Sequence, residues 1–272
     1  MKMKIGTVLT ATDLNPLYCD FIPIFVESWK KLIPEADICI VMIANEIPEK
    51  LKPYSLYIKL LPPIEGIHTA FQAQCIRLLY PRIIQRNEGV LITDMDMIPL
   101  SRKYYVDSIA NVPDDAFVVY RDVCLPGEIS MCYNVALPSI WKEMFGTNGI
   151  VAELNSWYEG RGYDGMHGGK GWGTDQVILV DKFNKWNGKK LVLNDTITNF
   201  HRLDRAFDGH LFSGENRPKL ASMIGREHYA DFHCFRPYTD YKEQNDFVVS
   251  CINNTKNPRS ALRLNLPPIN KW

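Results

Sequence analysis

The chain lacks several features that would assign it to a specialised class of protein. No apolar stretch in its 272 residues approaches the roughly 20 residues that a membrane-spanning helix needs. The first residues, MKMKIGTVLTATDLN, enter a strand-like run without the apolar region and cleavage site of a signal peptide. We therefore expect a soluble, cytoplasmic protein without a membrane anchor.

The sequence also has no excess of charge and no cysteine pattern. Lys plus Arg and Asp plus Glu number 31 each, so no net positive field attracts nucleic acid, and any anion must be bound locally. The seven cysteines are scattered and form no C-x-x-C pair, which favours reduced thiols over a disulfide framework or a zinc site. No internal repeat and no linker rich in Pro, Gly or Ser divides the chain, so we expect one domain.

Strand-like apolar runs alternate with segments of helical spacing in the first hundred residues. This alternation predicts a mostly parallel sheet covered by helices on both faces, a class that binds ligands at the carboxyl ends of its strands. Strands are expected over residues 5–11, 38–44, 56–61, 90–93, 116–120 and 129–136, and helices over residues 17–32, 69–85, 139–145 and 151–157.

Two aspartates stand at the end of one expected strand, in GVLITDMDMIPL (89–100). Side chains alternate on an extended segment, so Asp94 and Asp96 are expected to project to the same side. Mg²⁺ and Mn²⁺ prefer oxygen ligands and commonly join carboxylates to phosphate oxygens. The motif therefore predicts a divalent metal that holds a diphosphate; the alternative is a polar turn, where Asp is common.

The segment GRGYDGMHGGKGWG (160–173) holds seven of the 17 glycines and predicts a flexible loop that contains His167. Its G-x-G-x-x-G triplet follows a helix rather than a strand, which argues against a dinucleotide-binding fingerprint. Thr174 or Asp175 is expected to cap the helix that follows. Asp175 is also suited to act as a general base on a sugar hydroxyl, with Trp172 as an apolar platform for the sugar ring.

These motifs together resemble those of GT-A glycosyltransferases. GVLITDMDMIPL is similar to the Asp-x-Asp motif of those enzymes, and GWGTDQ to their acceptor-side segment, where an acidic residue opens a helix. TAFQAQCIRLLYPRII resembles the helix that precedes the metal motif in family 8 glycosyltransferases, and DFHCFRPY resembles that family's closing histidine and basic-Pro-aromatic triplet. The order of motifs agrees over roughly residues 5–240.

The resemblance implies a GT-A (Rossmann-like) α/β fold, with a mostly parallel central sheet flanked by helices and a smaller acceptor-side subdomain. It implies transfer of a sugar from a nucleoside diphosphate sugar, most commonly a UDP-sugar, to a glycan or other hydroxyl acceptor, with Mn²⁺ or Mg²⁺ as cofactor. The implied division is a nucleotide-binding half over about 1–100, an acceptor-side half over about 101–245 and a C-terminal tail over 246–272.

The resemblance also implies roles for individual residues. Asp175 would be the catalytic residue, and Trp172, Gly173 and Gln176 of the same segment would contact substrate. Arg236 stands where the family usually has lysine. The metal ligands would be Asp94, Asp96 and His233; the nucleotide diphosphate would contact Arg77, Asp94 and Arg236; and the nucleobase and ribose would be lined by Thr10, Ala11 and Thr12.

Several alternatives stay open at this point. The segment 171–176 is also similar to inverting galactosyltransferases, so retention or inversion of the anomeric centre is undecided. A haloacid-dehalogenase-like phosphatase also carries Asp-x-Asp after a strand, although Ile98 stands where that class has a hydroxyl residue or Val. A third alternative is a catalytically inactive module that binds a nucleotide or glycan. FHRLDRAFDGH (200–210) is expected to be a solvated loop rather than part of an acceptor cleft.

Overall fold

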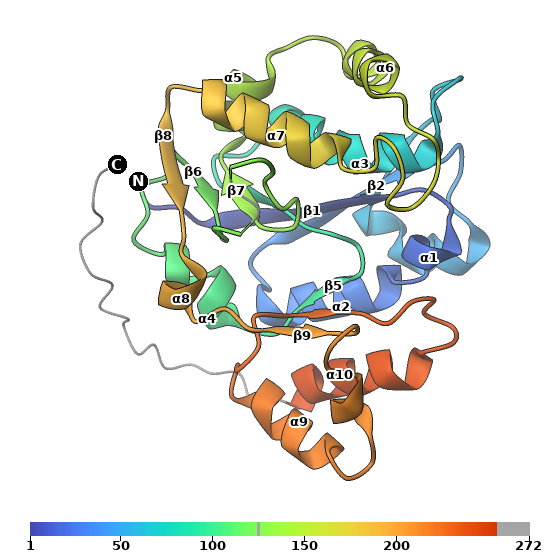
Figure 1. Ribbon diagram of the computed structural model, residues 1–272, viewed down its shortest axis with the longest axis vertical. Coiled ribbons are helices and arrows are strands. Elements are labelled where there is room, and N and C mark those ends of the chain that lie inside the picture. Colours follow the sequence, from blue (N-terminus) through green and yellow to red (C-terminus); the bar gives the residue numbers. More distant parts are fainter. Residues whose placement is uncertain (124–125, 255–272) are drawn as a thin grey trace.

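The computed structural model describes residues 1–123 and 126–254, and in this part of the chain a seven-stranded sheet forms the centre (Figure 1). The pairs β1–β2, β1–β4, β2–β3 and β6–β8 are parallel, and β7 runs antiparallel to β4 and β6. The mostly parallel α/β fold is therefore confirmed. The strands, in sheet order, are β3 (Ile58–Leu61), β2 (Asp37–Ile43), β1 (Ile5–Thr12), β4 (Gly89–Ile92), β7 (Asn134–Ala136), β6 (Ala116–Val119) and β8 (Lys189–Val192).

Helices cover both faces of this sheet. Successive residues of β2 alternate between two hydrophobic clusters, with Ile40 and Met42 in one and Val41 and Ile43 in the other. In Figure 1, α3, α5 and α7 lie on one side of the sheet and α1 and α2 on the other. The helices are α1 (Pro16–Cys19), α2 (Ile22–Leu32), α3 (Thr69–Leu79), α4 (Arg102–Tyr105), α5 (Pro138–Phe145), α6 (Ile150–Arg161), α7 (Thr174–Lys185), α8 (Asp195–Thr198), α9 (Arg217–Gly225) and α10 (Lys242–Asn254), with 3₁₀ turns η1 (Glu49–Tyr57), η2 (Pro81–Ile83), η3 (Asp107–Ile109) and η4 (Gly209–Phe212).

A second, three-stranded sheet lies beside the first and has the order β5 (Met97–Pro99), β10 (Asp231–His233) and β9 (Arg202–Asp204). The chain passes from β4 of the large sheet to β5 of the small one through residues 93–96, which include both aspartates of the Asp-x-Asp motif. In the register of the small sheet, His233 is opposite Met97 on one side and Asp204 on the other. The topology thus places His233 next to the aspartate turn.

Prolines account for two differences from the expected helices. The segment 17–32 forms two helices, α1 and α2, and Pro23 stands in the first turn of the second, a position where its missing N–H costs nothing. The segment 69–85 ends as an α-helix at Leu79, because Pro81 has no N–H to donate and begins a 3₁₀ turn.

Two expected strands are shorter than predicted. The strand expected over 56–61 begins at Ile58, since the residues before it form η1. Of the strand expected over 129–136, only β7 (Asn134–Ala136) forms. Ile129 and Met131 are buried, so their apolar character reflects packing in an irregular segment rather than a ladder.

No helix within residues 1–123 and 126–254 combines the length and the apolar character needed to cross a bilayer. Six cysteines in the same residues form no disulfide, and Cys124 lies outside the described residues. Of the expected C-terminal tail, residues 246–254 belong to α10, and residues 255–272 lie outside the described part.

Candidate active site

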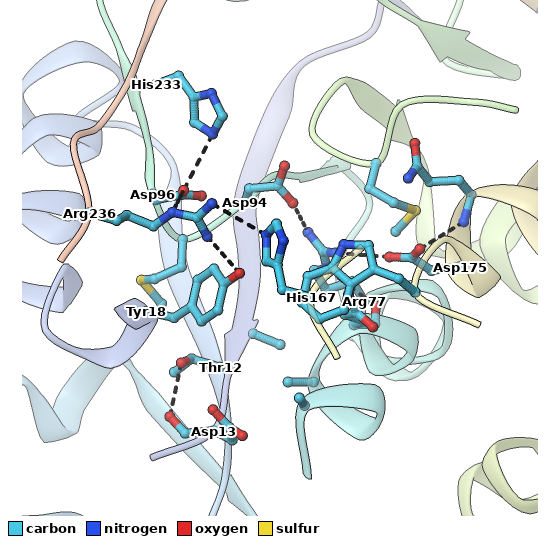
Figure 2. Close-up of a pocket in the computed structure, with 18 of the residues that line it drawn as sticks. Thr12, Asp13, Tyr18, Arg77, Asp94, Asp96, His167, Asp175, His233 and Arg236 are labelled. Atoms are coloured by element: carbon cyan, nitrogen blue, oxygen red, sulfur yellow. Dashed lines mark hydrogen bonds and ion pairs between the residues drawn. The ribbon is translucent and has the colours of Figure 1, made fainter. Parts of the chain in front are cut away.

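A cavity of about 290 Å³ opens where β1 and β4 end and the glycine-rich segment approaches the end of β10. Figure 2 shows its side chains converging from elements far apart in the sequence. It is lined by Ala11, Thr12, Asp13, Tyr18, Ala70, Ala73, Gln74, Arg77, Asp94, Met95, Asp96, Ser130, Met131, His167, Trp172, Asp175, Gln176, Arg205, His233 and Arg236.

Arg77 joins the two carboxylates that the sequence singled out. From the buried face of α3 it forms an ion pair with Asp94 and, through Nη2, a 3.0 Å pair with Asp175 Oδ2. Its Nη1 also donates to the carbonyl oxygen of Thr93 at 3.3 Å. Only 7% of Arg77 is exposed, so this side chain organises the site rather than contributing to a solvated helix face.

Asp96 lies within a cluster of cationic groups and is almost completely buried. Arg205 Nη1 donates to Asp96 Oδ2 at 2.9 Å, and Arg236 Nε and His233 Nε2 each lie 3.4 Å from the same oxygen. Burial by itself raises the pKa of Asp96, but His233, Arg236 and Arg205 outweigh it and hold the pKa well below its usual range. Asp96 is therefore ionised at neutral pH.

Both aspartates line the same cavity, but their carboxylates have different partners, and the segment is a turn rather than the expected extended strand. Strand β4 ends at Ile92, and the chain turns through the motif, with the backbone N–H of Met97 donating to the carbonyl of Asp94 at 3.3 Å. Figure 2 shows the Asp94 carboxylate directed toward Arg77, and that of Asp96 directed toward His233 and Arg236. Tight turning, rather than strand alternation, sets their directions.

The donor types at this turn are those that Mn²⁺ and Mg²⁺ accept. Asp94, Asp96 and His233 all line the cavity, and Asp96 Oδ2 and His233 Nε2 approach each other at 3.4 Å. In the arrangement described for residues 1–123 and 126–254, no three His, Cys, Asp or Glu side chains gather closely enough to hold a metal ion, because Asp94 is turned to Arg77. Two of the three ligands implied by the resemblance are thus already together.

The glycine-rich segment crosses the cavity and contacts the C-terminal part of the chain. Its bend is set by Asp164, which accepts hydrogen bonds from the backbone N–H groups of Met166 at 2.9 Å and Lys170 at 2.8 Å. The ring of His167 packs on Trp172, 4.4 Å between centroids, and His167 Nε2 lies 3.4 Å from Arg236 Nη2. The segment therefore has defined hydrogen bonds that place His167 and Trp172 in the cavity.

Asp175 lies in the first turn of α7 and is 3% exposed. The expectation that Thr174 or Asp175 caps this helix is wrong, because Gly173 holds the cap position and no side chain completes the cap. Thr174 Oγ1 instead donates to the carbonyl of Gly171 at 2.6 Å. Burial raises the pKa of Asp175 to about 6, although Arg77 opposes the rise. A carboxyl group with such a pKa is suited to exchange a proton near neutral pH.

Some of the other residues expected to contact nucleotide or substrate line the cavity, and others do not. Ala11 and Thr12 line the cavity, whereas Thr10 is fully buried in β1 outside it. Trp172 and Gln176 line it, and Gly173 acts as the cap of α7 instead.

Three polar residues were missed by the sequence patterns. Arg205 lies within 200–210, a segment expected to be a solvated loop; that expectation is wrong for Arg205, which binds Asp96 and the carbonyl oxygen of Cys234. Asp204 contacts His233. Tyr18 accepts a 2.6 Å hydrogen bond from Arg236 Nη1. No spacing rule connects these positions to the motifs, because the contacts join segments up to 218 residues apart.

No protein-family model matches the chain, and no curated protein matches it. Among solved structures, the chain is similar to the galactosyltransferase LgtC in complex with donor and acceptor sugar analogues, with 15% identity over 93% of this chain and 98% of that one and a TM-score of 0.47. It is also similar to the apo form of the glycosyltransferase GlyE of Streptococcus pneumoniae TIGR4, with 15% identity and a TM-score of 0.49. That match covers 92% of this chain and 62% of GlyE.

Proposed function

We propose that the protein is a glycosyltransferase that moves a sugar from a nucleoside diphosphate sugar, with a UDP-sugar as the expected donor, to a hydroxyl acceptor. The observation that carries the proposal is the composition of one cavity. It combines two arginines suited to a diphosphate, carboxylate and imidazole donors suited to a divalent cation, and a buried carboxyl group with a pKa of about 6.

Arg205 and Arg236 are the proposed contacts of the diphosphate. Both point at the buried Asp96 carboxylate, and a guanidinium group binds phosphate oxygens through a fixed fork of donors. Their charge is in place before the donor arrives, so little reorganisation is needed as negative charge develops on the leaving diphosphate. In the absence of donor, the same arginines neutralise Asp96.

A divalent cation would be held by Asp94, Asp96 and His233, and when bound it would act as a Lewis acid for the departing diphosphate. Asp94 would reach that position by leaving Arg77, which keeps its second partner, Asp175. Asp94 would thus exchange Arg77 for the cation, and Arg77 would keep Asp175. Neither charge would be left buried without a partner.

On the acceptor side, Asp175 is the proposed catalytic residue. With a pKa of about 6, it is mostly ionised at neutral pH and accepts the proton of the acceptor hydroxyl if transfer inverts the anomeric centre. If transfer retains it, Asp175 orients the donor or acceptor through its second oxygen. Trp172 offers an apolar face for a sugar ring, and Gln176 adds an amide next to it on the cavity wall.

The haloacid-dehalogenase-like alternative is not favoured by the charges around the motif. In such a phosphatase the second aspartate must exchange a proton, whereas Asp96 is held ionised by His233, Arg236 and Arg205.

Thermal unfolding in the presence of nucleoside diphosphates tests the proposal. A ligand that binds only the folded protein stabilises it by about 2.7 kcal/mol at 100 times its Kd, so UDP with Mn²⁺ should raise the Tm, and EDTA should remove the effect. Asp94→Asn should lose the shift while keeping the Tm of the ligand-free protein within a few degrees, because the Asp94 side chain is 34% exposed and Arg77 keeps Asp175 as a partner. The absence of a shift with any nucleoside diphosphate and metal would refute the donor site.

A turnover measurement distinguishes an active glycosyltransferase from a catalytically inactive binding module. Release of UDP from a UDP-sugar that stabilises the protein, measured with a panel of hydroxyl acceptors, is the expected result. Stabilisation without release of UDP or transfer to any acceptor would support the catalytically inactive binding module.

A further inference from the structure

The Nδ1 side of the His233 ring contacts the carboxylate of Asp204, a residue that no sequence motif identified. Strands β9 and β10 pair in parallel with Asp204 opposite His233, and His233 Nδ1 lies 3.2 Å from Asp204 Oδ2. A carboxylate only accepts hydrogen bonds, so the hydrogen in this contact belongs to Nδ1. The ring is thereby oriented with Nε2 toward Asp96, 3.4 Å from its Oδ2.

Asp204 is itself fixed in place before any ligand binds. Its Oδ1 accepts the backbone N–H of Ala206 at 2.8 Å, and its own backbone N–H donates to Asp208 Oδ2 at 2.8 Å. Arg202 Nη1 lies 3.9 Å from Asp204 Oδ2. The carboxylate therefore keeps its direction through contacts that do not involve His233.

The far side of the ring requires a cation. With the hydrogen on Nδ1, the Nε2 lone pair of His233 faces Asp96 Oδ2. Arg205 and Arg236 neutralise part of the charge on this oxygen, and positive charge directly between the two acceptors removes the remaining repulsion. A proton or a metal ion satisfies this requirement, and a carboxylate behind a ligating imidazole both fixes the ring and increases its basicity.

We propose that Asp204 is a positioning residue for the metal site, because it holds His233 with Nε2 directed to the cation shared with Asp96. The inference rests on the proposed function, since it assigns a role within the same donor site. Loss of such an outer carboxylate typically weakens metal binding by about 10- to 100-fold.

Mn²⁺ binding in the presence of UDP, followed by electron paramagnetic resonance of free Mn²⁺, tests the proposal without using activity. Asp204→Ala should raise the Kd of Mn²⁺ by about 10- to 100-fold. Asp204→Asn should fall between Asp204→Ala and the wild type, because its amide oxygen still accepts from Nδ1 but carries no charge. In a His233→Ala background, Asp204→Ala should have almost no further effect, because the group it orients is gone.

Asp208→Ala is the matched control. It removes the hydrogen bond to the Asp204 backbone but keeps the hydrogen bond from the Ala206 N–H to the Asp204 carboxylate, so the Kd of Mn²⁺ should rise much less than in Asp204→Ala. Far-UV circular dichroism and the Tm of each variant show that it is folded.

Two results would overturn the positioning role. One is an unchanged Kd in folded Asp204→Ala, and the other is an equal loss in Asp204→Ala and Asp208→Ala, which would assign the effect to the turn. A wild-type protein that binds UDP but no Mn²⁺ would instead overturn the metal site itself. A wild-type protein that binds neither ligand would overturn the proposed function.

Discussion

Replacing Arg77 by methionine tests whether the bridge between Asp94 and Asp175 organises the site. The substitution keeps an unbranched apolar stem in the buried position and removes the charge shared by both carboxylates. The consequences differ for the two partners, because the side chain of Asp94 is 34% exposed and that of Asp175 is 4% exposed.

The difference in exposure between Asp94 and Asp175 determines how much stability the loss of each ion pair removes. Water replaces Arg77 at Asp94, where an exposed pair contributes about 0–1 kcal/mol. Asp175 is left as an unpaired buried charge, and removing one partner of a buried pair costs about 3–5 kcal/mol. Without Arg77 the pKa of Asp175 rises above its value of about 6, and protonation of the carboxyl group limits this cost at pH 7. Arg77→Met should therefore lower the free energy of unfolding by about 3 kcal/mol, the lower end of that range, with most of the loss arising at Asp175.

Urea unfolding of the wild type, Arg77→Met and Arg77→Met/Asp175→Asn at pH 7 measures this loss. The double variant should recover most of the stability, because the neutral amide no longer needs a cation. Without Arg77 the pKa of Asp175 rises further, so lowering the pH protonates the carboxyl group and should reduce the loss. Arg77→Lys should lie between wild type and Arg77→Met, since one ammonium group does not span both carboxylates.

The reasoning would be refuted by a folded Arg77→Met variant whose stability lies within about 1 kcal/mol of wild type, the scale of an exposed pair. It would also be refuted if Asp175→Asn gave no recovery, because the buried charge would then not be the source of the loss.

Three further predictions concern activity. With Asp175 as the base and a pKa of about 6, kcat should fall roughly tenfold between pH 7 and pH 5, because the ionised fraction of the carboxyl group drops about tenfold; a flat kcat profile would contradict this role. Asp175→Asn should lower kcat by about 100-fold or more without weakening UDP binding, and an unchanged kcat in this variant would exclude a catalytic role. Trp172→Ala should raise the KM of the acceptor severalfold and leave the Kd of UDP unchanged, as measured by calorimetry, whereas equal losses for both ligands would refute the platform assignment.

The alternation of strands and helices could be read from the sequence because it follows from local hydrophobic spacing. The parallel core was predicted from runs such as 5–11 and 38–44, and β1 and β2 lie there. Hydrophobic spacing was less informative in two places. Helix α3 ends earlier than expected because a proline follows it. Most of the apolar residues of 129–136 pack without forming strand hydrogen bonds, so the strand there is short. Element boundaries depend on hydrogen bonds that hydrophobicity does not encode.

Only a few residues of the site could be predicted from local sequence signals. The Asp-x-Asp turn at Asp94 and Asp96 and the helix start at Asp175 carry local signals, namely a strand end and a glycine-rich approach, and the cavity contains all three. His233 and Arg236 were identified through a family resemblance and lie in the same cavity.

Only the tertiary structure decided how these side chains are paired. Arg77 reaches Asp175 across 98 positions of sequence, Arg205 reaches Asp96 across 109, and Tyr18 contacts Arg236 across 218. The sequence by itself determined which elements form and where carboxylates stand at their ends, because those properties depend on neighbouring residues. The pairing of charges depends on which strand ends meet and how deeply each group is buried, and both arise only when the two sheets pack together.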